Sequence, residues 1–331
     1  MRVKILPYVM MVLALCVVLP AQAQKLFPGL GEQRVGISSF TFLKIGVGAR
    51  SAALGESFIA MANDASALYW NPAGMVQINA NDVLFGHTEW FADIKHEFAG
   101  AVVQLTSEDA VGLSVIALYT DDMPVTTTVM PTGTGEMFSF RDLAFGLSYS
   151  RRMTDQFSFG ITARYVNERL AQLTMQNLLF DVGAYYLTGF STARFAITVS
   201  NFGGTAKPSG SVNVFGVGTV DQFEEFSPPT MFRLGFAMDP ILNETHRLTT
   251  SIQLNHPNDN AENLGLGVEY GWNNTVFLRV GYRVNVQEQR LPSFGVGARV
   301  PVELTVLTFD YGATDFGLLG MAHRFSLGIS L

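Results

Sequence analysis

The stretch Thr275-Val-Phe-Leu-Arg-Val-Gly-Tyr-Arg283 alternates apolar and polar side chains with a period of two. This period predicts a β-strand with two unlike faces. The apolar face holds Val276, Leu278, Val280 and Tyr282. The polar face holds Thr275, Arg279, Gly281 and Arg283. Both a soluble β-sandwich and a membrane β-barrel contain strands of this kind, so the rest of the chain has to distinguish them.

The same alternation recurs in about 14 segments, each near the ten residues that a tilted strand needs to cross a bilayer. We expect these strands at residues 83–91, 96–105, 110–119, 141–150, 156–166, 176–187, 193–201, 229–238, 246–255, 262–270, 275–284, 292–300, 303–311 and 321–331. The last segment alternates up to Leu331, as a closing strand must, although many outer-membrane proteins end on Phe.

The connections between these strands keep a parity that favours the barrel. Even-numbered connections are short, as in 106–109 and 271–274, whereas odd-numbered ones include the two longest, about 120–140 and 202–228. Outer-membrane barrels alternate short periplasmic turns with longer outer loops in this way. A soluble sandwich has no reason to do so. We therefore predict an all-β transmembrane outer-membrane barrel of about 14 antiparallel strands.

The beginning of the chain reads as a secretory signal. Arg2 and Lys4 precede an apolar run from Ile5 to Leu19, and Ala21-Gln22-Ala23 is typical of a cleavage site. We expect cleavage near Ala23 and delivery to the outer membrane of a diderm bacterium. The one cysteine, Cys16, would leave with this signal, so the mature chain would have no disulfide, thiolate metal site or cysteine nucleophile.

The low charge content is also compatible with a membrane barrel. Charged residues make up 15% of the chain, below the roughly 25% usual in soluble domains. The net charge is −7, and the sequence has no run rich in Lys and Arg. Nucleic acid is therefore not an expected partner, because phosphate binding needs clustered cations.

A segment of small and helix-compatible residues precedes the first strand. Apolar residues from Ser51 to Tyr69 follow a 3.6-residue period, which predicts one or two short helices that end at Pro72 and Gly74. A segment of this size cannot hold a core of its own. We therefore expect residues 24–80 to form a hatch tucked into the lumen, before a barrel over residues 81–331.

The hatch also carries a family resemblance. Asp64-Ala-Ser-Ala-Leu-Tyr-Trp-Asn-Pro-Ala-Gly74 resembles the hatch signature of the FadL superfamily, and Lys44 to Gly55 is more similar to its PorV/PorQ branch. Further similarity lies in Asp122–Thr127, Phe180–Gly183 and His323–Gly328, although Glu56 stands where the branch commonly has Gly. The residues that carry the hatch motif are Arg50, Asp64, Ser66, Trp70, Asn71, Pro72 and Gly74.

The resemblance implies a FadL-like barrel of 14 strands with a plug, and a role around the type IX secretion system. Secretion-machinery or secreted cargo proteins would then be its partners, beside outer-membrane lipid. Contacts would be made by the loops and the hatch, and we name Met123, Pro124, Phe215, Phe223 and Phe226 as candidate contact residues. The alternative is a FadL-like channel for a hydrophobic small molecule, with an apolar tunnel past Phe58 to an opening in the wall.

Catalytic and metal motifs find no support. The Gly-rich Pro131–Gly135 lacks the Lys-Ser/Thr of a phosphate loop, and no histidines have H-x-x-x-H spacing. His256–Glu262 has oxygen ligands but not the spacing of a calcium site, and His87, His96 and Glu97 are interpreted as parts of a solvated loop. We expect no enzymatic activity, cofactor or metal.

Arginines on the polar strand faces make a different prediction. An arginine that faced lipid near the membrane midplane would cost roughly 2–4 kcal/mol, so these side chains should face the lumen. The candidate lumen-facing arginines are Arg164, Arg279, Arg283 and Arg299, and Glu269 is an expected acidic partner in the lumen. Ion pairing with lumen or hatch acids is the favoured interpretation, and a passage for an anionic or amphipathic ligand is the alternative.

Overall fold

The computed structural model describes residues 36–214 and 218–331. The expected signal peptide (residues 1–23), the first part of the expected hatch and Phe215 lie outside the described residues. Within the described ranges, no helix has the length and apolarity needed to cross a membrane.

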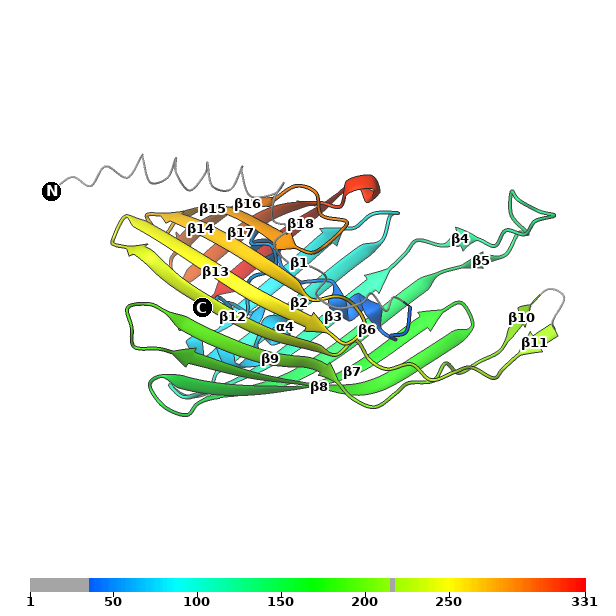
Figure 1. The fold of residues 1–331 in the computed structure, drawn as a ribbon, viewed down its shortest axis with the longest axis horizontal. Coiled ribbons are helices and arrows are strands. Elements are labelled where there is room, and N and C mark those ends of the chain that lie inside the picture. The colour runs from blue at the N-terminus through cyan, green and yellow to red at the C-terminus, as the bar shows by residue number, and fades with distance from the viewer. Residues whose placement is uncertain (1–35, 215–217) are drawn as a thin grey trace.

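Fourteen antiparallel strands close into one barrel, in which β1 pairs with both β2 and β18 (Figure 1). The barrel strands are β1 (Asp82–Glu89), β2 (Lys95–Gln104), β3 (Asp109–Tyr119), β6 (Phe140–Arg152), β7 (Phe157–Leu170), β8 (Leu173–Leu187), β9 (Arg194–Phe202), β12 (Met231–Leu242), β13 (His246–Pro257), β14 (Asn263–Trp272), β15 (Val276–Val284), β16 (Ser293–Val302), β17 (Thr305–Asp315) and β18 (Met321–Ser330). Each overlaps one segment of the sequence, so the predicted fold class is confirmed.

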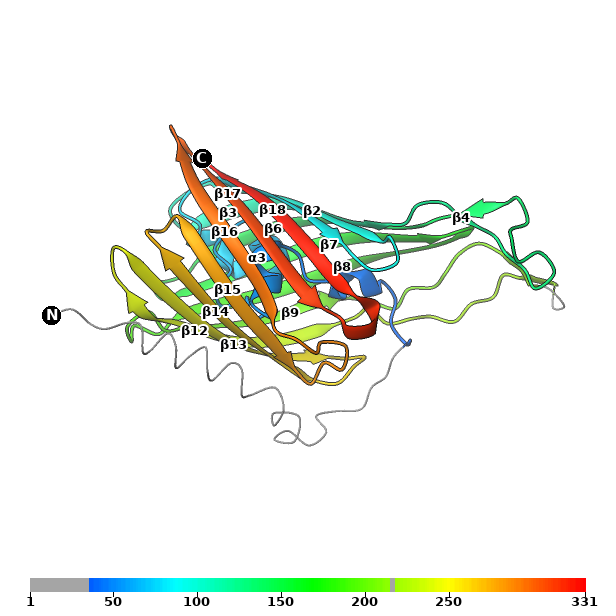
Figure 2. The same ribbon diagram turned by 90° about the horizontal axis from the view of Figure 1, so that it is seen from above.

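Two short hairpins extend the barrel at the end that carries the long connections (Figures 1 and 2). The first pairs β4 (Met123–Pro124) with β5 (Met137–Phe138), and the second pairs β10 (Val212–Val214) with β11 (Gly218–Val220). Because short turns face the periplasm in such barrels, the hairpins lie at the outer end.

One expected loop does not exist. The predicted strands leave residues 167–175 as a connection, but β7 and β8 continue through this region and are joined only by Ala171 and Gln172. Ala171 adopts the left-handed conformation (φ 51°) that so tight a turn requires. The sequence missed this turn because the strands here extend past the length that a bilayer crossing demands.

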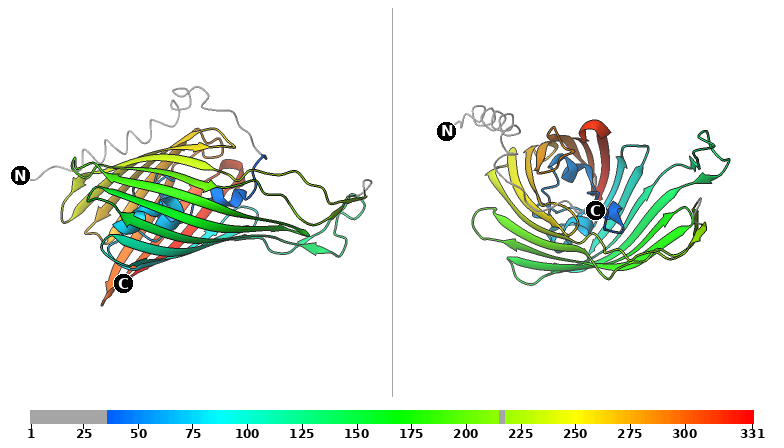
Figure 3. Two further views of the ribbon diagram at one scale, coloured as in Figure 1. Left: turned by 90° about the horizontal axis from the view of Figure 1, so that it is seen from below. Right: turned by 45° about the vertical axis from the view of Figure 1, so that its right-hand side comes forward.

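The plug lies inside the barrel and runs from its outer to its periplasmic end (Figure 3). Near the outer end the Phe40 amide donates to Glu168, and Lys44 pairs with Asp259. Near the periplasmic end the Val76 carbonyl accepts a hydrogen bond from Arg152. The chain therefore occupies the whole height of the lumen.

The plug contains less helix than its period predicts. Its elements are η1 (Thr41–Lys44), α3 (Ala49–Ala53), α4 (Ala67–Trp70) and η2 (Pro72–Gln77), and turns replace helix between α3 and α4. Leu54 and Ile59, both in this irregular stretch, are fully buried. Burial against the barrel wall thus fixes the segment without a helical backbone. A further single-turn helix, η3 (Gly317–Leu319), lies in the last outer loop.

Candidate functional site: the plug, the lumen and the outer loops

The Trp-Asn-Pro-Ala-Gly end of the hatch motif is a hydrogen-bonded knot in the lumen. The Trp70 indole donates to the Val47 carbonyl at 3.0 Å, and the side chain is 1% exposed. Asn71 caps η2 by accepting from the Ala73 amide, with Pro72 in the first turn of that helix. A Cβ at Gly74 would overlap the Ala62 carbonyl oxygen, so glycine is required by close approach.

The first half of the motif forms an ion pair with the barrel wall. Arg50 donates from Nε and Nη2 to both carboxylate oxygens of Glu269, at 2.8 and 2.9 Å. Its Nη1 reaches Asp64 at 3.1 Å, and the other Asp64 oxygen accepts from the amide and hydroxyl of Ser66. Burial by itself would lower the pKa of the Arg50 guanidinium, but the Glu269 carboxylate outweighs this effect and raises that pKa.

Wall residues continue this network across adjacent strands. Arg279 donates to Glu269 at 2.6 Å and to Asp310 at 2.6 Å, and it is 6% exposed. Arg299 lies beside them with its guanidinium 5.4 Å from the centre of the Phe277 ring. The resulting chain of alternating charges fastens the plug to β14, β15 and β17 inside the lumen.

Glu56 anchors the plug to the next strands. Its carboxylate pairs with Arg283 at 3.0 Å and approaches Arg324 at 3.9 Å. Glu56 has a φ of 58°, in the left-handed region that favours glycine. The Gly expected at this position by resemblance is thus replaced by a residue whose ion pairs offset the conformational cost.

Aromatic side chains cover Arg283 and Arg324, the two partners of Glu56, on the side toward the outer end of the barrel. Trp90, Phe91 and Phe316 contact one another with ring centroids 4.9–6.1 Å apart. The Arg324 guanidinium lies 5.3 Å from the Trp90 ring, and that of Arg283 lies 5.6 Å from the Phe316 ring. The first and last outer loops therefore close over this part of the lumen.

Arg164 lies on the opposite side of the plug. It pairs with Asp181 at 2.6 Å, and both side chains are at most 3% exposed. Its guanidinium is also 5.8 Å from the centre of the Tyr69 ring. The structure thus brings Arg279, Arg283 and Arg164 to carboxylates in the lumen, although it places them in three separate groups.

The outer loops carry the candidate contact residues in different environments. Met123 is half-buried and Pro124 exposed where β4 pairs with β5, and Phe223 is half-buried in the second long loop. Phe226 instead pairs its backbone with Ala206 and packs against the buried core. In the first hairpin, the exposed large apolar side chains are not those of the candidate residues but those of Val129 (82%), Met130 and Met137.

One feature of the wall was missed from the sequence. His87 and Glu97 do not belong to a solvated loop, because they face each other across β1 and β2 on the outward side of the barrel. Their side chains hydrogen-bond at 2.8 Å, whereas His96 points inward and is 1% exposed. The alternation with outward Phe85 would have placed His87 on this face.

The described residues contain no group of three or more His, Cys, Asp or Glu side chains placed to hold an ion. In the turn that was weighed as a calcium loop, His256 instead pairs with Glu262, and Asp259 pairs with Lys44 of the plug.

Comparison with known proteins identifies the family. A family model described as "Type IX secretion system protein PorV" matches residues 30–257, which is more than half of the chain. The chain belongs to the PorV family. The resemblance noted in its hatch motif is confirmed, and the protein is an outer-membrane β-barrel. No curated protein matches the chain.

Solved structures show the FadL-like fold. The chain is similar to the Pseudomonas putida toluene transporter TodX (TM-score 0.56, 12% identity, covering 86% of this chain and 96% of that one). It is also similar to the Ralstonia pickettii toluene transporter TbuX (0.54, 14%, 86% and 97%) and to a Pseudomonas aeruginosa FadL homologue (0.53, 12%, 90% and 99%). The family is described by its role in secretion, and two of these structures are described as transporters.

Proposed function

We propose that this PorV-family protein acts in protein secretion and surface delivery through contacts that its outer loops and hatch make with other proteins. The observation that carries the proposal is a lumen filled by an ion-paired plug beneath an outer hairpin, β4–β5, with exposed apolar side chains. Leu54, Phe58 and Trp70 are at most 1% exposed inside the barrel, so the plug occupies the route that a transported molecule would take.

The first hairpin has the composition of a protein-binding surface. Residues 123–135 contain no charged side chain, and Val129 is 82% exposed at the outer end. Exposed apolar side chains that gather at one place on a protein commonly mark an interaction site. The role that we propose for this surface is the binding of a protein partner.

A channel for hydrophobic small molecules is the second candidate. It is favoured by the likeness of the fold to toluene transporters. For transport, the plug would have to leave its ion pairs, because Arg50 and Glu56 of the plug pair with Glu269 and Arg283 of the wall.

An affinity pull-down from native outer membranes tests the proposal, with mass spectrometry of both the proteins and the apolar molecules recovered. We expect a stoichiometric protein partner that is lost in Val129→Asp. The matched control is Leu304→Asp, because Leu304 is an apolar side chain at least as exposed (94%) in a turn at the periplasmic end. Recovery of bound apolar molecules without a protein partner would overturn the proposal and favour the channel.

A further inference from the structure

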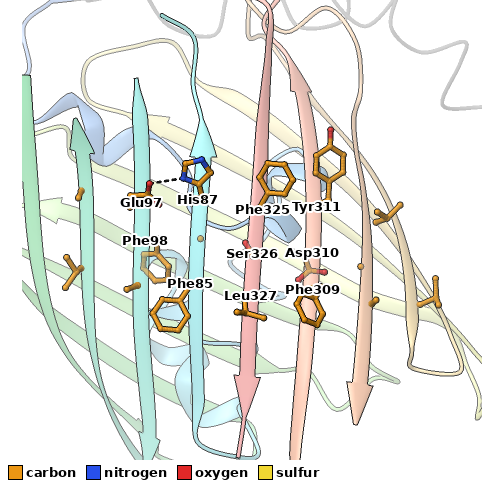
Figure 4. A pocket seen from close by; sticks show the side chains of 18 residues that line it. Phe85, His87, Glu97, Phe98, Phe309, Asp310, Tyr311, Phe325, Ser326 and Leu327 are labelled. Atoms are coloured by element: carbon orange, nitrogen blue, oxygen red, sulfur yellow. Dashed lines mark hydrogen bonds and ion pairs between the residues drawn. The ribbon is translucent and has the colours of Figure 1, made fainter. Parts of the chain in front are cut away.

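The outward wall of the barrel contains a concave groove of about 830 Å³ around the seam where β1 meets β18 (Figure 4). Small residues form its floor, including Gly86, Ala99 and Gly297. The volume of this groove lies within the range of about 300–1,000 Å³ found for ligand-binding pockets. The groove faces the membrane, and the surrounding strand pairing is continuous, so it is not a hole into the lumen.

Two rows of outward side chains cross the groove. The strand register places Phe85, Leu327 and Phe309 side by side in one row. Phe325 and Tyr311 lie in the next row toward the outer end, with ring centroids 5.3 Å apart. Phe85 and Phe309 are each 50% exposed, so this apolar surface needs a cover of similar chemistry in the membrane.

The second row ends on an ionisable pair. His87 continues it beside Phe325, and the Glu97 carboxylate accepts from His87 at 2.8 Å and from the Tyr119 hydroxyl at 3.3 Å. The two side chains are 40% and 35% exposed on the lipid-facing side. Ionisable groups in such positions are costly in lipid, and they generally mark functional sites.

The outer rim of the groove is acidic. Glu89, Asp93, Glu97 and Asp121 lie near the outer ends of β1 to β3, in the strands or in the loops that follow β1 and β3. Two cations lie among them, Lys95, which pairs with Asp121, and Arg141, which is exposed and in register with Tyr119. An anionic lipid headgroup would meet mostly like charges there. A protein segment with basic side chains would meet complementary ones.

We infer that this groove is a docking site, in the plane of the membrane, for a membrane-embedded segment of a partner protein. The segment has apolar side chains along its length and a Lys or Arg level with Glu97. This contact is separate from the outer-loop surface and goes beyond the proposed function.

Site-specific photo-crosslinking in intact outer membranes tests this inference. A photoreactive residue replaces Phe325 in the groove or Ile197 on the opposite wall, and these positions are matched in exposure (46% and 45%). We expect a protein crosslink from position 325 that is at least tenfold weaker from position 197. The crosslink should fall at least tenfold in Glu97→Lys and persist in Phe145→Leu, an outward substitution on β6.

Two results would overturn the inference. One is lipid adducts alone from position 325, as expected of ordinary membrane contact, and the other is a protein crosslink that Glu97→Lys leaves unchanged. Heat-modifiable gel mobility verifies that each variant is a folded barrel. Val129→Asp separates the two proposals, because it changes the outer loop and leaves the groove intact. If the pull-down finds no partner that depends on Val129 but the crosslink from position 325 persists, the docking site is supported although the proposed secretion role fails.

Discussion

Replacing Arg50 by Met should release the plug from the barrel wall. The Arg50 guanidinium makes two hydrogen bonds to Glu269 and one to Asp64, and its side chain is 16% exposed. Breaking a buried ion pair from one side costs about 3–5 kcal/mol. Glu269 keeps Arg279 at 2.6 Å, so we expect the lower end, about 3 kcal/mol, which is roughly a hundredfold in an equilibrium constant.

Thiol labelling measures this displacement directly, because the sequence has no cysteine after Cys16. Ser57→Cys provides the probe: Ser57 is 1% exposed, and its hydroxyl has no hydrogen-bond partner to lose. The labelling rate should rise about a hundredfold when Arg50→Met is added, if plug release and return are fast relative to labelling.

The matched control is Arg151→Met, in which an exposed arginine loses two loose contacts to acids at 3.6 and 3.8 Å. Surface pairs of this kind contribute about 0–1 kcal/mol, so labelling should change less than about fivefold. Arginine is charged at neutral and mildly alkaline pH, and the raised pKa of Arg50 extends this charged range upward, so the ratio between variants should be the same at both pH values. A labelling rate within threefold of the parent, in a folded barrel, would refute the role of Arg50.

Three further substitutions test the local geometry through the temperature at which the barrel unfolds on a denaturing gel. Gly74→Ala should destabilise by about 1–3 kcal/mol, because its Cβ would overlap the Ala62 carbonyl; an unchanged temperature would contradict this packing. Glu56→Gly should relieve about 1 kcal/mol of backbone strain but leave Arg283 unpaired, for a net loss of about 2–4 kcal/mol; stabilisation would show that the pair contributes little. Ala171→Gly should stabilise by about 1 kcal/mol, since Ala171 has a φ of 51° in a two-residue turn; a lower unfolding temperature would argue against that turn.

The sequence alone determined the barrel, through the number of its alternating segments and the parity of its connections. The alternation itself is local, so the stretch Thr275–Arg283 reveals a strand with two unlike faces without knowledge of its neighbours. The hatch motif was equally legible, since Asn71 and Pro72 act within one turn of each other. The alternation also required Arg279 to avoid lipid.

Only the tertiary structure decided which groups meet. Arg50 and Glu269 are 219 residues apart, and their contact depends on how deep the plug lies and on which strands it touches. The left-handed backbone of Glu56 follows from that same fit. The groove around the β1–β18 seam depends on the register that sets small residues of one strand beside large residues of the next, which no single strand encodes. Local periodicity thus fixed the faces of the strands, and long-range packing decided what those faces contact.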